Sequence, residues 1–232
     1  MKARLVACGY SQVEGQDYTE VFAATLRAAS FRLFCCLVAA WDWETDQIDA
    51  VKAFTQSDVD TEIYVEMPEG FTVPGYVLKL RRALEGIKQG AHLWFAKNKQ
   101  ALEAVGLVPS LSEPNIYMHS KHRVMVAAFV DDIIASFAPS AGDEYLHIKT
   151  EYAKLINIGC MNVRAVHKFT GVEISRNREA RSITLTQFGY IKELARRYAG
   201  KFVESYHEGK TPGKSLSRIT CNWLGAYCGP LT

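Results

Sequence analysis

Apolar residues recur along the chain with two spacings, one typical of helices and the other typical of strands. Residues 25–41 have the helical spacing, with apolar side chains at Leu26, Ala29, Leu33, Leu37 and Val38. We expect this helix to begin near Thr25 or Ser30 and to lie behind a sheet. Helical patterns also cover residues 91–105 and 141–156.

The strand-like segments are shorter and stand between these helices. Strands are predicted over residues 2–7, 61–71, 77–80, 116–118, 124–130 and 183–187, the last leading into a helix that reaches residue 199. The order helix, strand, strand, helix around residues 116–130 favours an α+β fold with a central antiparallel sheet.

Two adjacent acids interrupt the most apolar strand segment. Asp131 and Asp132 stand between Val124–Val130 and Ile133–Ser136, whose β-branched and aromatic residues predict a hairpin with the acids at or beside its turn. Ionised carboxylates beside a buried sheet cost on the order of several kcal/mol unless a positive charge neutralises them, and like charges repel. A divalent metal ion is one remedy, and an Asp-Asp turn exposed to water is the alternative.

A third acid, Asp49, lies in the strand-like segment Gln47–Phe54 and again has apolar neighbours, so we expect it to be buried. A single strand Asp followed much later by an Asp-Asp hairpin resembles the catalytic palm of reverse transcriptases. Between them, Leu84–Gln89 followed by Leu93-Trp94 is similar to the "LYGLKQ…LW" signature of copia-type retrotransposon polymerases. Residues 2–7 and 169–174 also resemble motifs of this family. Together, in the family's order, the motifs span about residues 1–212.

The resemblance implies a polymerase right hand with fingers, a palm built on the central antiparallel sheet, and a truncated thumb. Approximate boundaries are residues 1–30 and 57–93 for the fingers, 31–56 and 94–178 for the palm, and 179–232 for a partial thumb or connection-like segment. Residues beyond Lys214 match no recognised motif.

The resemblance also implies a two-metal site for phosphoryl transfer. Two Mg²⁺ ions, with Mn²⁺ as an alternative, would be bridged by Asp49 and Asp131, while Asp132 assists and the Ala50 carbonyl is a further ligand. The same resemblance implies nucleotide contacts at Lys2, Arg4, Phe54, Gly86 and Gln89, and a primer grip that includes Phe169 and Gly171.

Each nucleotide contact has a simpler alternative. Lys2 and Arg4 could be solvated strand-edge cations, Gln89 a solvated side chain on a surface turn, and Phe54 a core residue. Asp49 and Phe54 have an odd offset, which on a strand would send their side chains to opposite faces. The resemblance implies that the Phe54 ring lies beneath the incoming sugar and acts as a gate that excludes a 2′-hydroxyl. This gate role requires the backbone to bend or to begin a helix within residues 51–54.

Four positions depart from the family pattern. Glu85 and Phe129 each replace a tyrosine, Cys8 replaces a basic residue, and Thr170 replaces a leucine. The change at Glu85 places a charge where an aromatic ring usually packs, which predicts some loss of activity. Trp94 is expected in the core rather than as a platform for base stacking.

Net charge is unevenly distributed, although the whole chain carries only +2. Residues 1–159 hold 15 Lys and Arg against 20 Asp and Glu, a balance of −5, whereas residues 160–232 hold 12 against 5, a balance of +7. This C-terminal excess suggests either contact with a polyanion or a solvated basic face.

The six cysteines form no Cys-x-x-Cys motif and pair with no spaced histidines, which predicts reduced structural thiols rather than a zinc or redox site. The longest apolar run, residues 33–40, is far shorter than the roughly twenty residues that span a bilayer. No secretory signal is visible, and we expect an intracellular setting, cytoplasmic or, by resemblance, within a virus-like particle.

The resemblance implies an RNA-directed DNA polymerase fragment that binds an RNA or DNA template with its primer, together with dNTPs. One alternative is a catalytically inactive nucleic-acid-binding remnant of a decayed element. A nucleotidyl cyclase also uses a palm-like sheet and paired acids, but it would lack the Lys88-Gln89 motif and the primer-grip resemblance. The sequence leaves the oligomeric state open.

Overall fold

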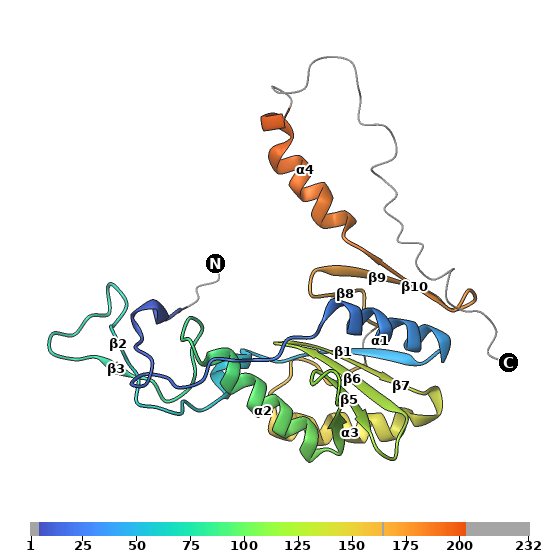
Figure 1. Ribbon diagram of the computed structural model, residues 1–232, viewed down its shortest axis with the longest axis horizontal. Helices are drawn as coiled ribbons and strands as arrows, with labels where there is room; N and C mark the ends of the chain where they lie inside the picture. Colours follow the sequence, from blue (N-terminus) through green and yellow to red (C-terminus); the bar gives the residue numbers. More distant parts are fainter. Residues whose placement is uncertain (1–4, 164, 203–232) are drawn as a thin grey trace. The chain divides into compact units, whose positions relative to one another are not determined.

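The structure, a computed structural model, describes residues 5–163 and 165–202 (Figure 1). The chain forms two compact units, the first ending at Val166 and the second beginning at His167. None of the described helices is long and apolar enough to cross a membrane.

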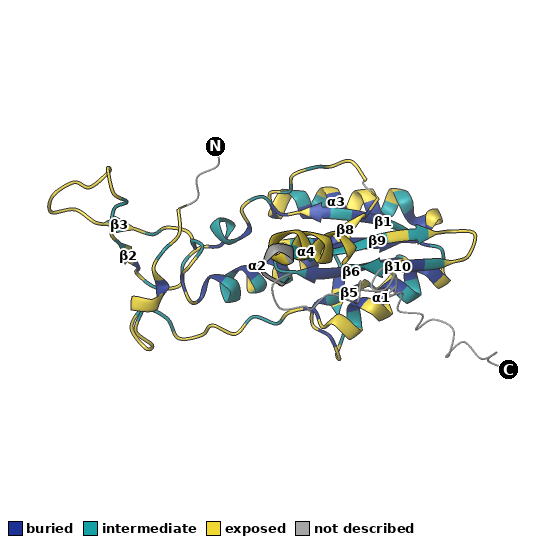
Figure 2. Cartoon of the chain, turned by 90° about the horizontal axis from the view of Figure 1, so that it is seen from above, coloured by how far each residue is buried: buried dark blue, intermediate teal, exposed yellow. Residues whose placement is uncertain are grey.

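The first unit is built around a five-stranded antiparallel sheet. Its spatial order is β1 (Glu44–Asp49), β7 (Asp132–Phe137), β6 (Val124–Phe129), β5 (Ile116–His119) and β4 (Leu107–Pro109). The predicted hairpin is confirmed, because β6 and β7 pair in register and are joined by Val130 and Asp131. These two central strands are buried along almost their whole length, as expected for strands covered on both faces (Figure 2).

Helices cover both faces of this sheet. Helix α1 (Ala28–Ala40) lies on one side, and α2 (Gly90–Ala104) and α3 (Gly142–Leu155) lie on the other, as Figure 1 shows. All three helices were predicted, but the buried face expected for α1 was correct only in part, because Val38 is buried as expected whereas Ala29 and Leu33 are exposed. Leu33 is 58% exposed, whereas α1 buries Phe31, Phe34, Cys35, Val38 and Ala39.

The main core lies between the sheet and the helices α2 and α3. Alternate residues of β6 and β7 reach it, from Val124 and Val126 on one strand to Ile133 and Ala135 on the other, and they pack with Trp94, Leu102, Tyr145, Ile148 and Tyr152. Because strand side chains alternate between faces, Asp132 and Asp49 point to the side opposite their buried neighbours Ile133 and Ile48.

The remaining elements of the first unit are short. The strands β2 (Tyr64–Val65) and β3 (Leu78–Lys79) pair with each other, but β2 is far shorter than the strand expected over 61–71. Residues 5–7 form no strand, contrary to expectation, and instead lie beside the signature motif, with Ala7 N donating to Glu85 O at 2.7 Å. The 3₁₀ turns are η1 (Gly9–Ser11), η2 (Ala53–Gln56) and η3 (Pro139–Ala141).

The second unit contains a three-stranded antiparallel sheet in the order β10 (Ser182–Thr186), β9 (Val172–Asn177) and β8 (Lys168–Phe169), followed by α4 (Phe188–Phe202). The predicted strand and helix after residue 182 are therefore confirmed. The fold as a whole is a mixture of helices and antiparallel sheets, as predicted. Its division into fingers, palm and thumb stays a prediction.

Candidate active site

Strand register brings two of the predicted acids directly opposite each other. Asp49, the last residue of β1, pairs with Asp132, the first residue of β7, which pairs in turn with Phe129. Cross-strand neighbours of this kind have Cβ atoms about 4.5–5.5 Å apart, so the two carboxylates start from the same face at close range. Like charges placed this way destabilise a sheet unless a cation or water screens them.

The three acids are more exposed to water than their apolar neighbours in the sequence suggested. Asp49 and Asp131 are exposed and Asp132 is half-buried, so water screens the three charges. The expectation that Asp49 is a buried acid was therefore wrong. Its apolar neighbours Ile48 and Ala50 are buried, and because side chains alternate along a strand, that burial sends Asp49 outward.

The hairpin turn holds Asp131 through its backbone. Val130 has a φ of 51°, a left-handed conformation that a β-branched residue rarely adopts. Such a conformation costs on the order of 1–3 kcal/mol and persists only when its surroundings impose it. Trp94 supplies one constraint, since its buried indole Nε1 donates to the Val130 carbonyl at 2.6 Å. The expected core position of Trp94 is confirmed, with 1% exposure.

A loop that sequence patterns did not single out lies along the Asp49 backbone. Gly159 N donates to Asp49 O at 2.8 Å, Val51 N donates to Asn157 O at 2.9 Å, and Ala50 forms an antiparallel bridge with Ile158. A Cβ built on Gly159 would lie 3.5 Å from Asp49 Oδ2. The residues after α3 thus extend the sheet edge beside the acid, and the glycine allows the loop to come close.

The chain bends immediately after this segment, as required by the predicted role of Phe54. Lys52 adopts a left-handed conformation with φ 51°, and η2 begins at Ala53. Phe54 is half-buried against the main core, and its Cδ1 would lie 3.7 Å from a Cβ added to Gly90. The bend is confirmed, while the gate role of Phe54 stays a prediction.

Gln89 is fully buried rather than a solvated residue of a surface turn. Its Nε2 donates to Asp17 O at 2.8 Å, and its Oε1 accepts from Gln12 Nε2 at 3.0 Å. Gly86, with φ +96°, lies against the backbone of Ala7, whose oxygen would be 2.1 Å from an added Cβ. The backbone of the N-terminal segment therefore approaches Gly86 so closely that a side chain would not fit there.

The remaining predicted site residues lie elsewhere. Lys2 and Arg4 are outside the described residues. Phe169 and Gly171 belong to the second unit, where Phe169 is buried and Gly171, with φ +83°, forms the turn between β8 and β9. That turn confirms the hairpin, and its primer-grip role stays a prediction.

The three acids suit magnesium in ligand chemistry, because Mg²⁺ prefers oxygen ligands and takes one or two carboxylates with substrate phosphates and water. Within residues 5–163 and 165–202, however, no group of three or more His, Cys, Asp or Glu side chains is arranged to hold a metal ion. A facing pair, Asp49 and Asp132, with Asp131 exposed beside it, is consistent with ions that arrive together with phosphates.

Sequence reasoning missed a buried charged cluster behind Asp49. Asp46 and Lys149 are fully buried, Lys149 Nζ lies 2.5 Å from Asp46 Oδ2, and the Tyr145 hydroxyl donates to the same oxygen. Burial, reinforced by the Asp46 carboxylate, raises the pKa of Tyr145. One signal was available, because Lys149 shares the apolar stripe of Tyr145, Ile148 and Tyr152.

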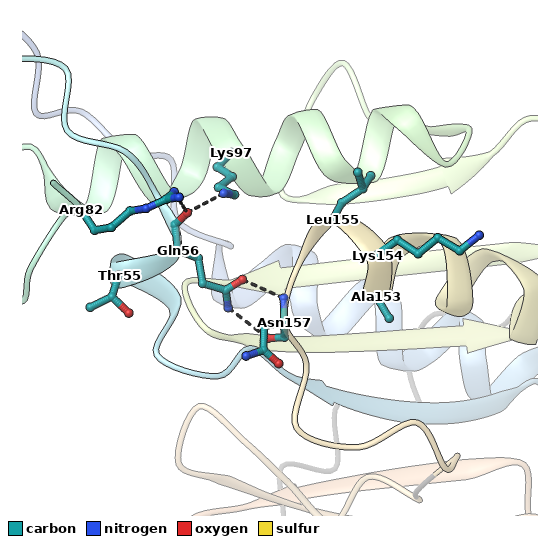
Figure 3. Close-up of a pocket in the computed structure, with 8 residues that line it drawn as sticks. All are labelled: Thr55, Gln56, Arg82, Lys97, Ala153, Lys154, Leu155 and Asn157. Carbon is teal, nitrogen blue, oxygen red and sulfur yellow. Dashed lines mark hydrogen bonds between the residues drawn. The ribbon is translucent and has the colours of Figure 1, made fainter.

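A pocket of about 490 Å³ lies between η2, α2 and the end of α3 (Figure 3). It is lined by Thr55, Gln56, Arg82, Lys97, Ala153, Lys154, Leu155 and Asn157. The Gln56 carbonyl accepts from Arg82 at 3.1 Å and from Lys97 at 2.5 Å. Arg82 and Lys154 are each already paired with a carboxylate, so the pocket offers an anion little uncompensated charge.

Comparison with known proteins identifies a family that the chain matches. Residues 1–203 match the family described as reverse transcriptase (RNA-dependent DNA polymerase). The chain is 30% identical over 226 residues to the retrovirus-related Pol polyprotein from transposon TNT 1-94 of Nicotiana tabacum, covering 95% of this chain and 17% of that protein.

Two further relatives extend the match. Identity is 31% over 201 residues to the retrovirus-related Pol polyprotein from transposon RE2 of Arabidopsis thaliana, covering 84% of this chain and 13% of that protein. Identity is 25% over 183 residues to the transposon Ty1-BR Gag-Pol polyprotein of Saccharomyces cerevisiae, covering 76% of this chain and 10% of that protein. The chain thus spans less than a fifth of each polyprotein's length, and it belongs to the reverse transcriptase family of retrotransposon Pol polyproteins.

Proposed function

We propose that this chain is the polymerase part of a copia-type retrotransposon polyprotein and adds deoxynucleotides to a primer paired with an RNA or DNA template. The observation that carries the proposal is the facing of Asp49 and Asp132 beside Asp131, in a chain that belongs to the reverse transcriptase family. Template, primer and dNTPs are the partners that this activity requires.

The acids have separate tasks in this proposal. Asp49 and Asp131 would hold two Mg²⁺ ions, with Asp132 assisting and the Ala50 carbonyl as a further oxygen ligand. When bound, the ions stabilise the attacking and leaving oxygens of an in-line phosphoryl transfer. The Asp49 carbonyl accepts from Gly159 N at 2.8 Å and the Asp131 carbonyl accepts from Ala50 N at 3.4 Å, so the backbone of each acid is tied to a neighbouring segment.

Residues other than Asp49, Asp131 and Asp132 orient the substrates. Phe54, at the bend after Asp49, packs beneath the incoming sugar, and Lys2 and Arg4 bind its triphosphate. Gln89 and Gly86 act through the backbone that they hold, since their close contacts are with residues 6–17 and with Asp60. Phe169 and Gly171 position the primer end.

Primer extension tests the proposal. Asp49→Asn and Asp131→Asn should each abolish magnesium-dependent extension on an RNA template, while Asp143→Asn, which removes an exposed acid from the first turn of α3, should not. Melting temperature should stay equal or rise in Asp49→Asn, because the change relieves repulsion across the Asp49–Asp132 pair. Full activity of either active-site variant would remove these acids from the mechanism.

A second candidate function is a nucleic-acid-binding remnant without polymerase activity. Glu85 favours it, because a half-buried acid stands in the signature motif where the family has tyrosine. The same assay separates the two candidates, since a remnant binds template and primer without extending them. Restoring the aromatic ring with Glu85→Tyr should raise extension if this substitution limits activity.

A further inference from the structure

We infer that Trp94 is a positioning residue for the acid hairpin, and that it holds the peptide group preceding Asp131. The inference rests on the proposed function for its catalytic consequence. The link between α2 and the hairpin is a property of the fold and can be tested without any polymerase activity.

The contact between Trp94 and Val130 is short and buried, and only the indole can be the donor. Trp94 is 1% exposed, and its Nε1 lies 2.6 Å from the Val130 carbonyl oxygen. Indole carries a single N–H donor and no acceptor, so the bond can form only if that carbonyl points toward α2. A phenylalanine ring would fill much of the same space and could not make the bond.

Fixing this carbonyl fixes the direction in which the chain enters Asp131. The Val130 C=O and the Asp131 N–H belong to one planar peptide group, so holding the oxygen holds the whole plane. The next peptide group is also bound, because Asp131 O accepts from Ala50 N at 3.4 Å. Both peptide groups that flank Asp131 are therefore attached to other elements, one to α2 and one to the residue after Asp49.

The turn needs such support because of its own conformation. Val130 has a φ of 51°, which a β-branched residue adopts only under constraint. Without the indole bond, the Val130–Asp131 peptide is free to rotate toward a more common turn. The Asp131 carboxylate would then leave its position relative to Asp49, although the paired strands β6 and β7 would remain.

The opposite end of this link is equally well anchored. Helix α2 begins at Gly90, directly after the buried Gln89, and Leu93 N donates to Gln89 O at 3.0 Å. Gln89 is bound in turn to Asp17 and Gln12. Trp94 thus connects the segment proposed to line the nucleotide pocket with the hairpin that carries the acids.

The test compares Trp94→Phe with Trp43→Phe. Trp43 is a matched control because it is also buried, at 5% exposure. It directly precedes Glu44, which pairs with Phe137 at the opposite end of the two strands from Asp49 and Asp132. Hydrogen–deuterium exchange of the indole N–H groups is followed by NMR in the unsubstituted chain, with Trp41, 44% exposed, as the internal fast-exchanging standard.

Three results are expected. The Trp94 indole N–H exchanges at least about tenfold more slowly than that of Trp41, as a buried bonded group should. Trp94→Phe shifts or broadens the backbone amide signals of Asp131 and Asp132, and Trp43→Phe does not. The kcat for extension falls about tenfold in Trp94→Phe at unchanged template–primer Kd, and the magnesium concentration for half-maximal rate rises.

Rapid exchange of the Trp94 indole, or hairpin amide signals that do not move in Trp94→Phe, would overturn the inference whatever the activity. Equal losses of kcat in Trp94→Phe and Trp43→Phe would also overturn it, since a general loss of packing would then explain both. If the unsubstituted chain does not extend a primer but the hairpin signals respond to Trp94→Phe, the proposed function fails and the link between Trp94 and Val130 stands.

Discussion

The buried pair of Asp46 and Lys149 predicts a large and specific loss of stability when its cation is removed. Both side chains are fully buried, and Lys149 Nζ donates to Asp46 Oδ2 at 2.5 Å and to Asn162 O at 3.2 Å. Lys149→Met keeps the length of the side chain but takes the cation away from the Asp46 carboxylate, to which the Tyr145 hydroxyl still donates. The variant therefore removes the charge together with the hydrogen bond to Asn162 O.

The expected magnitude follows from the burial of both partners. Removing one member of a buried ion pair costs about 3–5 kcal/mol, because the other charge remains uncompensated in a medium of low dielectric constant. For a unit of this size, each kcal/mol lowers the melting temperature by roughly 2–4 °C, so the loss should be about 6–20 °C. Lys154→Met is the control, since water screens the exposed Lys154–Glu151 pair and its loss should change the stability little.

The assay is thermal and urea denaturation of the parent and the three variants Lys149→Met, Lys154→Met and Asp46→Asn with Lys149→Met. The double variant removes both charges and keeps an acceptor for Tyr145, so it should recover most of the loss. A Lys149→Met variant that loses less than about 1 kcal/mol, or a double variant no more stable than the single one, would refute the reasoning.

Further predictions concern the site and the surface. Phe54→Ala should raise the ratio of ribonucleotide to deoxyribonucleotide kcat/KM if the ring excludes a 2′-hydroxyl, whereas a core role would lower both alike and cost about 3–5 kcal/mol. Arg196→Ala with Arg197→Ala should flatten the log–log salt dependence of template–primer affinity, by about 0.9 for each phosphate that is no longer neutralised; an unchanged slope assigns both to a solvated face. Burial raises the pKa of the Cys35 thiol to about 12, so iodoacetamide at pH 8 should label exposed Cys8 and spare Cys35 until the protein unfolds; labelling at equal rates contradicts the burial.

Local patterns determined the kinds of element present. Apolar spacing predicted the three helices of the first unit within a few residues, and the β-branched flanks of the two acids predicted the hairpin. These features depend on short-range preferences and on periodicity, which sequence records directly. The ordered motifs also indicated the family, which the match over residues 1–203 confirmed.

Patterns failed where several faces compete for burial. Helix α1 is apolar nearly all round, so periodicity could not decide that Phe31 and Phe34 would be buried and Leu33 exposed. The acid Asp46 looked no different from Asp49 along the strand. Only its position facing α3, where it meets Lys149 and Tyr145, makes one acid a buried ion-pair partner and the other an exposed member of the site.

The spatial meeting of the acids was decided by tertiary structure alone. The sequence placed Asp49 and Asp132 in separate strands, but their facing depends on the pairing of β1 with β7 in one register, and a slip by one residue would turn Asp49 to the opposite face. Likewise, nothing local to Trp94 indicated its bond to Val130, because the two residues approach only when α2 packs on the sheet. Contacts between residues distant in the chain arise from packing, which a single sequence does not record.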